Sequence, residues 1–215
     1  MKPPISCAWN FPPPSEWPPD DDVIAVGADL APDTLLYAYS HGIFPMYLGN
    51  NRRDLGWWSP VRRGVIPLDA LRITRSMRQS ARKFTVTFDR CFTDVMLHCS
   101  TSHQEGNWIT KDFIDAYTAL HRLGHAHSVE VWNTHDQLVG GLYGVRINNF
   151  FAGESMFHHE RDASKVALMH LVDAMNAAQM TLLDTQWCTE HLATLGCIEI
   201  PRATYLDLVT RAVLE

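Results

Sequence analysis

The stretch SVEVWNTHDQLVGGLYGVRINNFFAGESMF, residues 128–157, decides the fold of this chain. Apolar and polar residues alternate in its first part, and two further runs contain β-branched and aromatic residues. Short polar turns at 133–136 and 148–149 separate these runs at the spacing of hairpins. The stretch therefore predicts an antiparallel meander with strands at 128–132, 138–146 and 150–157.

Helices and further strands flank the meander. The segment 163–179 is expected to be an amphipathic helix, because its apolar residues recur at i, i+3, i+4 and i+7, namely Leu168, Leu171, Val172 and Met175. Other helices are expected between 29 and 42 and at 71–81, 92–99, 111–123, 189–195 and 202–213. Strands are expected at 65–68, 84–88 and 181–185, and a loop at 43–47. Hairpins followed by a helix and a returning strand predict an α+β fold.

Composition indicates a globular chain. With 215 residues and 46% hydrophobic content, it can bury a core. It has no apolar run long enough to span a membrane, and its N-terminus lacks the apolar region of a secretory signal. The five cysteines include no C-x-x-C pair, which favours buried free thiols in a reducing compartment. We therefore expect a cytoplasmic location.

The first 22 residues contain seven prolines and end in three aspartates. Proline is excluded from helix interiors and sheet ladders, so an extended arm is predicted. Its aromatic residues Trp9, Phe11 and Trp17 indicate that the arm packs on the body of the protein. The pair Trp57–Trp58 is expected either in a core at a domain junction or as a stacking platform.

Basic residues gather in one segment. Residues 52–83 carry nine Lys and Arg against two Asp, although the whole chain has a net charge of −6. This asymmetry predicts either a phosphate-binding patch or a merely solvated surface. Three arginines share one helix face, at i, i+3 and i+7, so the candidate phosphate contacts are Arg75, Arg78, Arg82 and the adjacent Lys83.

Three polar residues are candidates for chemistry. Asp184 and Gln186 lie at i and i+2 on a predicted strand, so both are expected to point to one face. There Gln186 would hold an amine and Asp184 would orient the amide; alternatively, Asp184 caps the next turn and Gln186 is a surface amide. Glu154 lies mid-strand among apolar residues, where an unpaired carboxylate is costly. It would bind a ligand's ammonium or hydroxyl groups, or form a salt bridge with Arg161 or Lys165.

The histidines and cysteines do not indicate a metal. His125 and His127, the run 158–160, and Cys188 with His191 each lack a full set of ligands at zinc spacing. We therefore expect neither a metal nor a cofactor.

Ten segments occur in order between about residue 23 and residue 210: GIFP (42–45), WWSP (57–60), RSM (75–77), GNWIT (106–110), LGHAHSVEVW (123–132), LVGGLYG (138–144), GESMF (153–157), ASK (163–165), LDTQ (183–186) and HLATLG (191–196). Each segment alone is weak, but together they are specific. The chain resembles the leucyl/phenylalanyl-tRNA–protein transferase family.

The resemblance implies a small N-terminal domain, residues 1–60, and a catalytic domain of acetyltransferase-like (GNAT) fold, residues 61–215, with a mostly antiparallel sheet flanked by helices. It implies a monomeric enzyme that takes leucine, phenylalanine and, less well, methionine from aminoacyl-tRNA. The amino acid is joined to proteins that begin with lysine or arginine, which marks them for N-degron-dependent degradation.

The resemblance also implies site residues. Catalysis falls to Asp184, Gln186 and Glu154, and the last of these would hold the acceptor's ammonium or the ribose hydroxyls. The 3′ end of the aminoacyl-tRNA would be bound by Trp108, Met46, Tyr117, Leu142, Phe151, Leu171, Met175 and Leu183; each apolar member is alternatively plain core. Met46, Leu171 and Met175 stand where the family often has aromatic residues, which leaves the preferred amino acid open.

Two rival functions follow from the same residues. An acyl-CoA N-acetyltransferase would need a glycine-rich turn after the third strand, and residues 158–165 contain no glycine. A non-catalytic tRNA-binding module would leave the carboxylate of Glu154 without a purpose.

Overall fold

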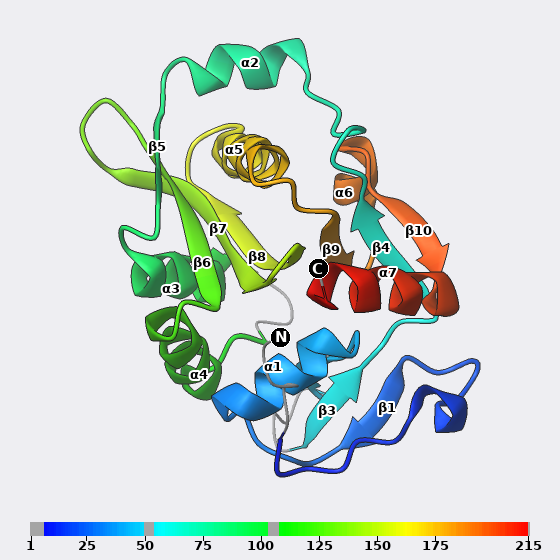
Figure 1. The fold of residues 1–215 in the computed structure, drawn as a ribbon. Coiled ribbons are helices and arrows are strands. Elements are labelled where there is room, and N and C mark those ends of the chain that lie inside the picture. Colours follow the sequence, from blue (N-terminus) through cyan, green and yellow to red (C-terminus); the bar gives the residue numbers. More distant parts are fainter. Residues whose placement is uncertain (1–6, 50–53, 103–107, 215) are drawn as a thin grey trace.

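The computed structural model describes residues 7–49, 54–102 and 108–214. Within these ranges the chain forms a three-stranded and a seven-stranded sheet, with helices packed around the larger one (Figure 1). The predicted α+β fold is confirmed. Within the same ranges, no helix is long and apolar enough to cross a bilayer. Arg52, Arg53 and the segment 106–107 of the sequence prediction lie outside the described residues.

The smaller sheet is antiparallel and consists of β1 (Val23–Val26), β3 (Leu55–Trp58) and β2 (Phe44–Tyr47), in that order. The loop expected at 43–47 is therefore wrong. Pro45 disfavours a strand in sequence, yet β2 is an edge strand, and an edge tolerates a residue without an N–H.

The proline-rich arm packs against this sheet, as predicted. It includes the short 3₁₀ helix η1 (Pro14–Glu16). Phe11 is buried and meets the fully buried Trp57 edge-on, with ring centroids 4.9 Å apart. Trp57 is thus a core residue. The arm also meets the far end of the chain, because Nη1 of Arg202 donates to the carbonyl of Pro18 over 2.8 Å.

The larger sheet has the order β10-β4-β9-β8-β7-β6-β5, and only β8 and β9 pair in parallel. Its strands are β4 (Arg62–Ile66), β5 (Thr85–Phe88), β6 (Ala126–Trp132), β7 (Leu138–Ile147), β8 (Phe150–His158), β9 (Leu182–Gln186) and β10 (Ile198–Pro201). The meander β6-β7-β8 confirms the prediction from residues 128–157. Strand β10 is an addition that the sequence pattern did not predict.

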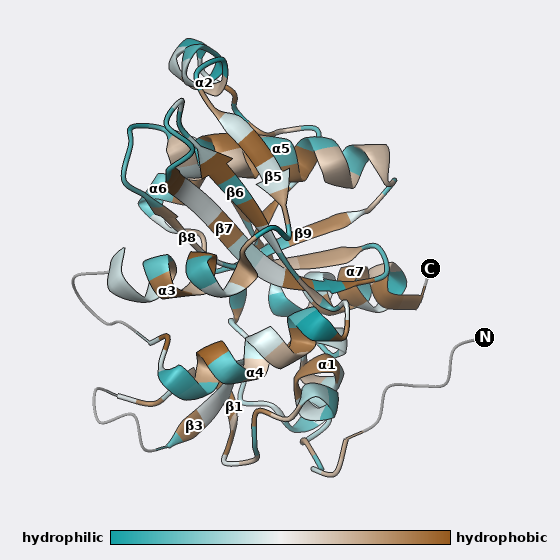
Figure 2. Ribbon diagram, turned by 90° about the vertical axis from the view of Figure 1, so that its left-hand side faces the viewer, coloured by the Kyte–Doolittle hydropathy of each residue, from teal (hydrophilic) through white to brown (hydrophobic). Residues whose placement is uncertain are grey.

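Helices cover both faces of this sheet (Figure 2). One face packs with α1 (Pro32–Ser40), α3 (Phe92–Ser102), α4 (Lys111–Arg122) and α7 (Arg202–Leu214), and the other with α2 (Arg75–Ala81), α5 (Ala163–Ala177) and α6 (Glu190–Thr194). Helix α2 is shorter than the expected 71–81, because Thr74 accepts a hydrogen bond from Met77 N–H and caps its start.

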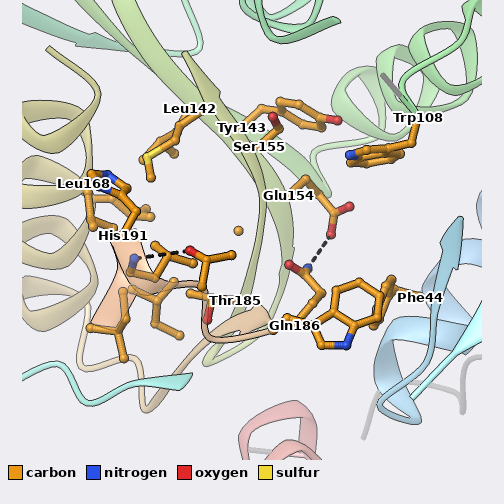
Figure 3. A pocket seen from close by; sticks show the side chains of 18 of the residues that line it. Phe44, Trp108, Leu142, Tyr143, Glu154, Ser155, Leu168, Thr185, Gln186 and His191 are labelled. Carbon is orange, nitrogen blue, oxygen red and sulfur yellow. Dashed lines mark hydrogen bonds between the residues drawn. The ribbon is translucent and has the colours of Figure 1, made fainter. Parts of the chain in front are cut away.

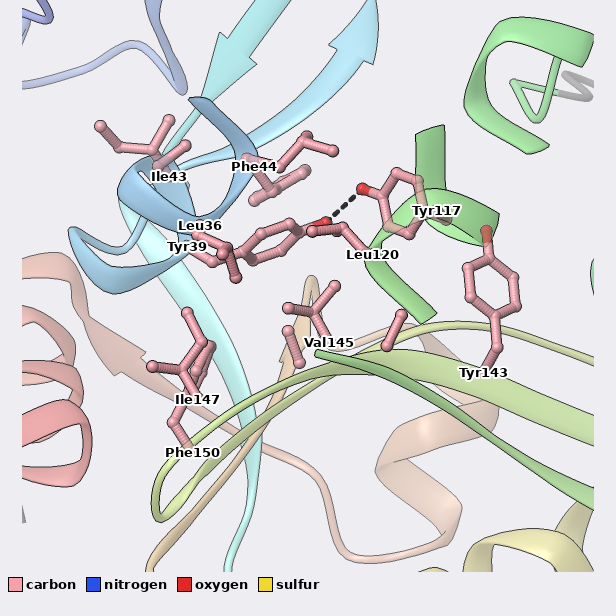
Figure 4. Packing of buried hydrophobic residues seen from close by; sticks show 14 of the residues in the cluster. Leu36, Tyr39, Ile43, Phe44, Tyr117, Leu120, Tyr143, Val145, Ile147 and Phe150 are labelled. Atoms are coloured by element: carbon pink, nitrogen blue, oxygen red, sulfur yellow. Dashed lines mark hydrogen bonds between the residues drawn. The ribbon is translucent and has the colours of Figure 1, made fainter. Parts of the chain in front are cut away.

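The predicted boundary at residue 60 falls between the two sheets, since β3 ends at Trp58 and β4 begins at Arg62. One apolar cluster nevertheless runs through both parts. In Figure 4, Tyr39 of α1 meets Tyr117 of α4 above Val145 of β7. The division into two domains therefore stays a prediction.

The parallel pairing of β8 and β9 is short. It joins residues 150–152 to residues 182–184 and then stops, although both strands continue. Helix α5 connects the two strands, as a parallel pair requires. Beyond Ala152 and Asp184 the strands separate, and this separation creates the space for the candidate site.

Candidate active site

A cavity of about 410 Å³ lies between the diverging ends of β8 and β9 (Figure 3). This volume is in the range of small-molecule sites. Phe44 and Met46 of the smaller sheet reach its rim together with Trp108. Its wall is largely apolar and includes Ile66, Leu142, Met156, Leu168, Leu171 and Leu183. The site therefore offers apolar surface to a large apolar side chain.

Five of the eight predicted pocket residues line this cavity: Met46, Trp108, Leu142, Leu171 and Leu183. Tyr117, Phe151 and Met175 do not, and all three are buried core residues. Met175 lies one turn beyond Leu171 on α5 and extends the core past the cavity. Sequence reasoning missed Phe44, Met156, Leu168 and His191 on the lining. The helical spacing put Leu168 on an apolar helix face but not in a pocket, and the other three follow no distinctive spacing.

A buried ion pair stands behind the cavity. The guanidinium of Arg63 donates to both carboxylate oxygens of Asp184, over 2.8 and 2.6 Å. The hydroxyl of Tyr205 also donates to Asp184, over 3.0 Å, and all three side chains are buried. Burial lowers the pKa of Arg63, but the charges of Asp184 and Tyr205 and the hydrogen bonds to Asp184 together raise it above its usual value. Sequence reasoning missed Arg63 within the basic segment, where only the apolar run that follows it signalled burial.

Gln186 reaches the cavity, but Asp184 does not. A register shift opposite Gly64 interrupts the pairing of β9 with β4 between these two residues, so the expectation that both point to one face stays a prediction. Gln186 has φ +57°, and its backbone N–H donates to Asp184 over 3.0 Å. Asp184 thus caps this turn, as the alternative held, whereas Gln186 is 8% exposed and no surface amide.

Gln186 and Glu154 form a pair at the cavity edge. Nε2 of Gln186 donates to Oε1 of Glu154 over 3.0 Å, and Figure 3 shows the amide oxygen of Gln186 on the cavity side. The alternative salt bridge of Glu154 is wrong, because Lys165 and Arg161 instead lie 3.2 and 3.8 Å from the carboxylate of Asp162.

The surroundings of Glu154 favour its neutral form. Burial raises its pKa to about 8, and the hydroxyls of Tyr39 and Tyr117 act against this increase. Tyr117 donates to Oε2 of Glu154 over 3.5 Å and is itself hydrogen-bonded to Tyr39. A carboxyl group that titrates near neutral pH can take up or release a proton at the pH of a cell.

The candidate phosphate contacts lie away from this cavity. Arg75, Arg78 and Arg82 are exposed on and beside α2, as is Lys83, and none forms a salt bridge among the described residues. Helix α2 is fixed to the body by Ser76 and Ser80, which donate to Asp162 over 2.7 and 3.1 Å. In the described part of the chain, no group of three or more His, Cys, Asp or Glu could hold a metal.

Comparisons with known proteins agree on one family. Residues 65–210 match the family model described as leucyl/phenylalanyl-tRNA protein transferase, and residues 28–61 match its N-terminal domain. A leucyl/phenylalanyl-tRNA–protein transferase of Pseudoalteromonas atlantica is 44% identical over 209 residues, covering 95% of this chain and 88% of that one. Another, of Ruegeria pomeroyi, is 46% identical over 186 residues, covering 86% and 87%.

Solved structures resemble the chain more distantly. A GNAT-family acetyltransferase of Staphylococcus aureus matches with a TM-score of 0.35 and 18% identity, covering 45% of this chain and 68% of that one. The structure of L-PGS from Bacillus licheniformis matches with a TM-score of 0.42 and 10% identity, covering 71% and 64%. The assignment of the chain to the α+β class therefore rests on the strand order described above.

Breaking the buried ion pair is expected to destabilise the protein strongly. Arg63→Met should lower the free energy of unfolding by about 3–5 kcal/mol, because it leaves Asp184 buried and unpaired. Urea denaturation measures this change. The matched control is Arg62→Met, whose exposed pair with Glu199 is worth at most about 1 kcal/mol. The double variant Arg63→Met/Asp184→Leu should regain most of the stability, and equal midpoints for wild type and Arg63→Met would contradict the prediction.

The raised pKa of Glu154 predicts a pH-dependent stability. Unfolded glutamate titrates near 4.3, and the folded residue near 8. Between these values the folded state keeps a proton that the unfolded state has released, so stability should fall as pH rises, by up to about 1.4 kcal/mol per pH unit, and level off above 8. In urea titrations from pH 5 to 8, the free energy of unfolding of Glu154→Gln should not show this decrease with rising pH. The variant of the exposed Glu199, Glu199→Gln, should show the same decrease as wild type. Parallel profiles of wild type and Glu154→Gln would disprove it.

Proposed function

The chain belongs to the leucyl/phenylalanyl-tRNA protein transferase family, and on this premise we propose that it transfers leucine, phenylalanine and, less well, methionine from aminoacyl-tRNA to the α-amine of proteins that begin with lysine or arginine. The transfer would mark those proteins for degradation. We propose that the enzyme acts as a monomer in the cytoplasm and needs no cofactor. The observation that carries this proposal is the Gln186–Glu154 pair at the edge of an apolar cavity.

The cavity supports a donor with a large apolar side chain. Leu142, Leu171 and Leu183 offer it surface without any polar group that would require a partner. Such a pocket discriminates mainly by size, at about 1–3 kcal/mol per methylene. Leucine, phenylalanine and methionine therefore all fit the proposal. Trp108 at the rim would stack on the terminal base, which is worth about 1–3 kcal/mol.

The chemistry is aminolysis of the ester that joins the amino acid to tRNA. The acceptor's α-amine attacks the ester carbonyl, a C–N bond forms, the C–O bond to ribose breaks, and one proton passes to the leaving oxygen. Free α-amines have a pKa of about 7.7–8.0, so a part is already neutral at pH 7 and a strong base is unnecessary. The main task is to align two large substrates.

Three residues divide this task in our proposal. The amide oxygen of Gln186 accepts a hydrogen bond from the amine and holds it in line with the carbonyl. The fraction of Glu154 that is deprotonated receives the amine's proton and passes it to the leaving ribose oxygen, since its pKa of about 8 is close to that of the amine. Asp184 is a positioning residue, because it holds the backbone N–H of Gln186, is itself held by Arg63 and Tyr205, and lies outside the cavity.

The turn between β8 and α5 speaks against an acyl-CoA N-acetyltransferase. A pyrophosphate would need free backbone N–H groups at the start of α5. There the buried carboxylate of Asp162 lies instead, and it is engaged by Ser76, Ser80 and Lys165. A negative charge at this point would repel a phosphate. A pure binding module remains disfavoured, since Glu154 is placed beside Gln186 within the cavity.

The basic face of α2 would contact tRNA phosphates. Arg75, Arg78 and Arg82 are exposed and free of salt bridges in the described part of the chain, whereas Arg63 is buried and no longer counts toward this surface. A solvated surface is the alternative, and a salt titration distinguishes the two.

Transfer should depend on Gln186. We expect purified wild type to move labelled leucine from leucyl-tRNA to a peptide that begins with arginine, and not to the same peptide with an acetylated N-terminus. Gln186→Ala should lower turnover by about 100-fold or more, as loss of a group that aligns or stabilises the reacting centre does. Gln137→Ala, the same change in an exposed turn, should leave turnover unchanged. Full activity of a folded Gln186→Ala variant would refute the assigned role.

Binding of tRNA should weaken with salt through α2. The double variant Arg78→Ala/Arg82→Ala should bind tRNA more weakly, and the slope of log K against log salt should shrink by about 0.7–0.9 for each phosphate that the variant no longer neutralises. Filter binding at several salt concentrations measures both quantities. Arg211→Ala, an exposed arginine on α7, is the control. An unchanged slope in the double variant would favour the merely solvated surface.

A further inference from the structure

The cavity mouth holds an aromatic side chain that the reaction does not use. Trp187 follows Gln186 directly, lines the cavity and is partly exposed. Its ring meets Phe44 and Trp58 in T-shaped contacts, with centroids 5.1 and 5.8 Å apart. Two aromatic residues of the smaller sheet therefore fix the orientation of this indole beside the Gln186–Glu154 pair.

A carboxylate of the proline-rich arm lies behind the same indole. Nε1 of Trp187 donates to Oδ2 of Asp22 over 3.0 Å, and the backbone N–H of Val61 donates to Oδ1 over 2.8 Å. Both oxygens thus have a donor that carries no charge. The guanidinium of Arg202 donates instead to backbone carbonyls of the arm. Asp22 forms no salt bridge within the described residues, and the charge of Arg202 acts on it only from beyond salt-bridge distance.

We infer that Trp187, with Asp22 behind it, is the binding site for the cationic side chain of the acceptor's first residue. The inference rests on the proposed function, in which Gln186 holds the α-amine of that residue. The Cα atoms of Gln186 and Trp187 are about 3.8 Å apart across one peptide bond. Both side chains line the same cavity, so a lysine or arginine side chain leaving the bound amine is within reach of the neighbouring indole.

The other groups around the cavity are already engaged. Asp184 is neutralised by Arg63, whose guanidinium also covers the ring of Phe44 at 4.8 Å. Glu154 is held by Gln186 and is largely protonated at pH 7, since burial raises its pKa to about 8. Of the aromatic residues that line the cavity, Trp187 is the one that directly follows Gln186 in the chain.

The chemistry of the pair suits a cation better than a neutral chain. An indole is the best aromatic partner for an ammonium or guanidinium, and a guanidinium also stacks on its face. The hydrogen bond from Nε1 to a carboxylate increases the negative character of the ring. An uncharged side chain of equal length would have the apolar contact alone.

The test compares charged and neutral acceptors of equal shape. Leucyl-tRNA is supplied at saturation, and kcat/KM is measured for peptides that begin with arginine or citrulline, and with lysine or norleucine. Wild type should prefer each charged peptide by roughly 2- to 30-fold, the range of a cation–π contact. Trp187→Leu should bring both ratios close to one, whereas Trp187→Phe should keep part of the preference, and the KM for leucyl-tRNA should not change.

Two further variants separate recognition from stability. Asp22→Asn should reduce the ratio of kcat/KM for charged over neutral peptides. If Trp187→Leu does not fold, Asp22→Asn and Trp187→Phe provide the test instead. Trp132→Phe, the same kind of change on β6 away from the cavity lining, should keep the wild-type ratio. Equal rates of wild type with charged and neutral peptides, or an unchanged ratio in Trp187→Leu, would overturn this inference and leave the proposed function intact. Failure of wild type to transfer leucine to any peptide would overturn both.

Discussion

The buried ion pair between Arg63 and Asp184 is the constraint on which the site depends. Two charges removed from water are stable only when each is fully hydrogen-bonded, and here the guanidinium meets both carboxylate oxygens while Tyr205 donates a third bond. The pair fixes the end of β9 against β4. Asp184 then holds the backbone of Gln186, so the left-handed turn that aims the amide at the cavity follows from a charge interaction outside it.

The cavity itself follows from a sheet that stops pairing. Strands β8 and β9 share three pairs of residues and then separate, which exposes one side of each strand to the space between them. Apolar residues of β7, α5 and β9 line one part of this space, and Phe44 and Met46 of the smaller sheet close another. The smaller sheet is therefore a wall of the site. This explains why the chain packs both sheets against one continuous apolar cluster.

Much of the fold was predictable from sequence because its signals are local. The alternation in residues 128–157 and the helical spacing around Leu171 identified the meander and α5. Strand β2 was not predicted, because Pro45 is unfavourable in a strand unless the strand lies at the edge of its sheet. Which strands lie at an edge is known only once the sheet is assembled. For the site, Gln186, Glu154 and Asp184 were found through their strand positions and the family resemblance, but sequence did not show that Asp184 lies outside the cavity, since a register shift leaves no mark in sequence. In the sequence, Arg63 cannot be distinguished from the other arginines of the basic segment. Its buried partner Asp184 lies 121 residues away, so only the tertiary structure identifies the pair.

The contacts of α7 have a consequence for how the chain folds. Tyr205 reaches back to Asp184 and Arg63, and Arg202 reaches the arm at Pro18, 184 residues earlier. During synthesis α7 follows all of these partners. A nascent chain that still lacks α7 therefore has neither the hydrogen bonds of Tyr205 to the Arg63–Asp184 pair nor the contact of Arg202 with the arm. Contacts at such separation slow folding, since the loop entropy must be given up before they form. The contacts that hold the Arg63–Asp184 pair behind the site are thus completed only after α7 has left the ribosome.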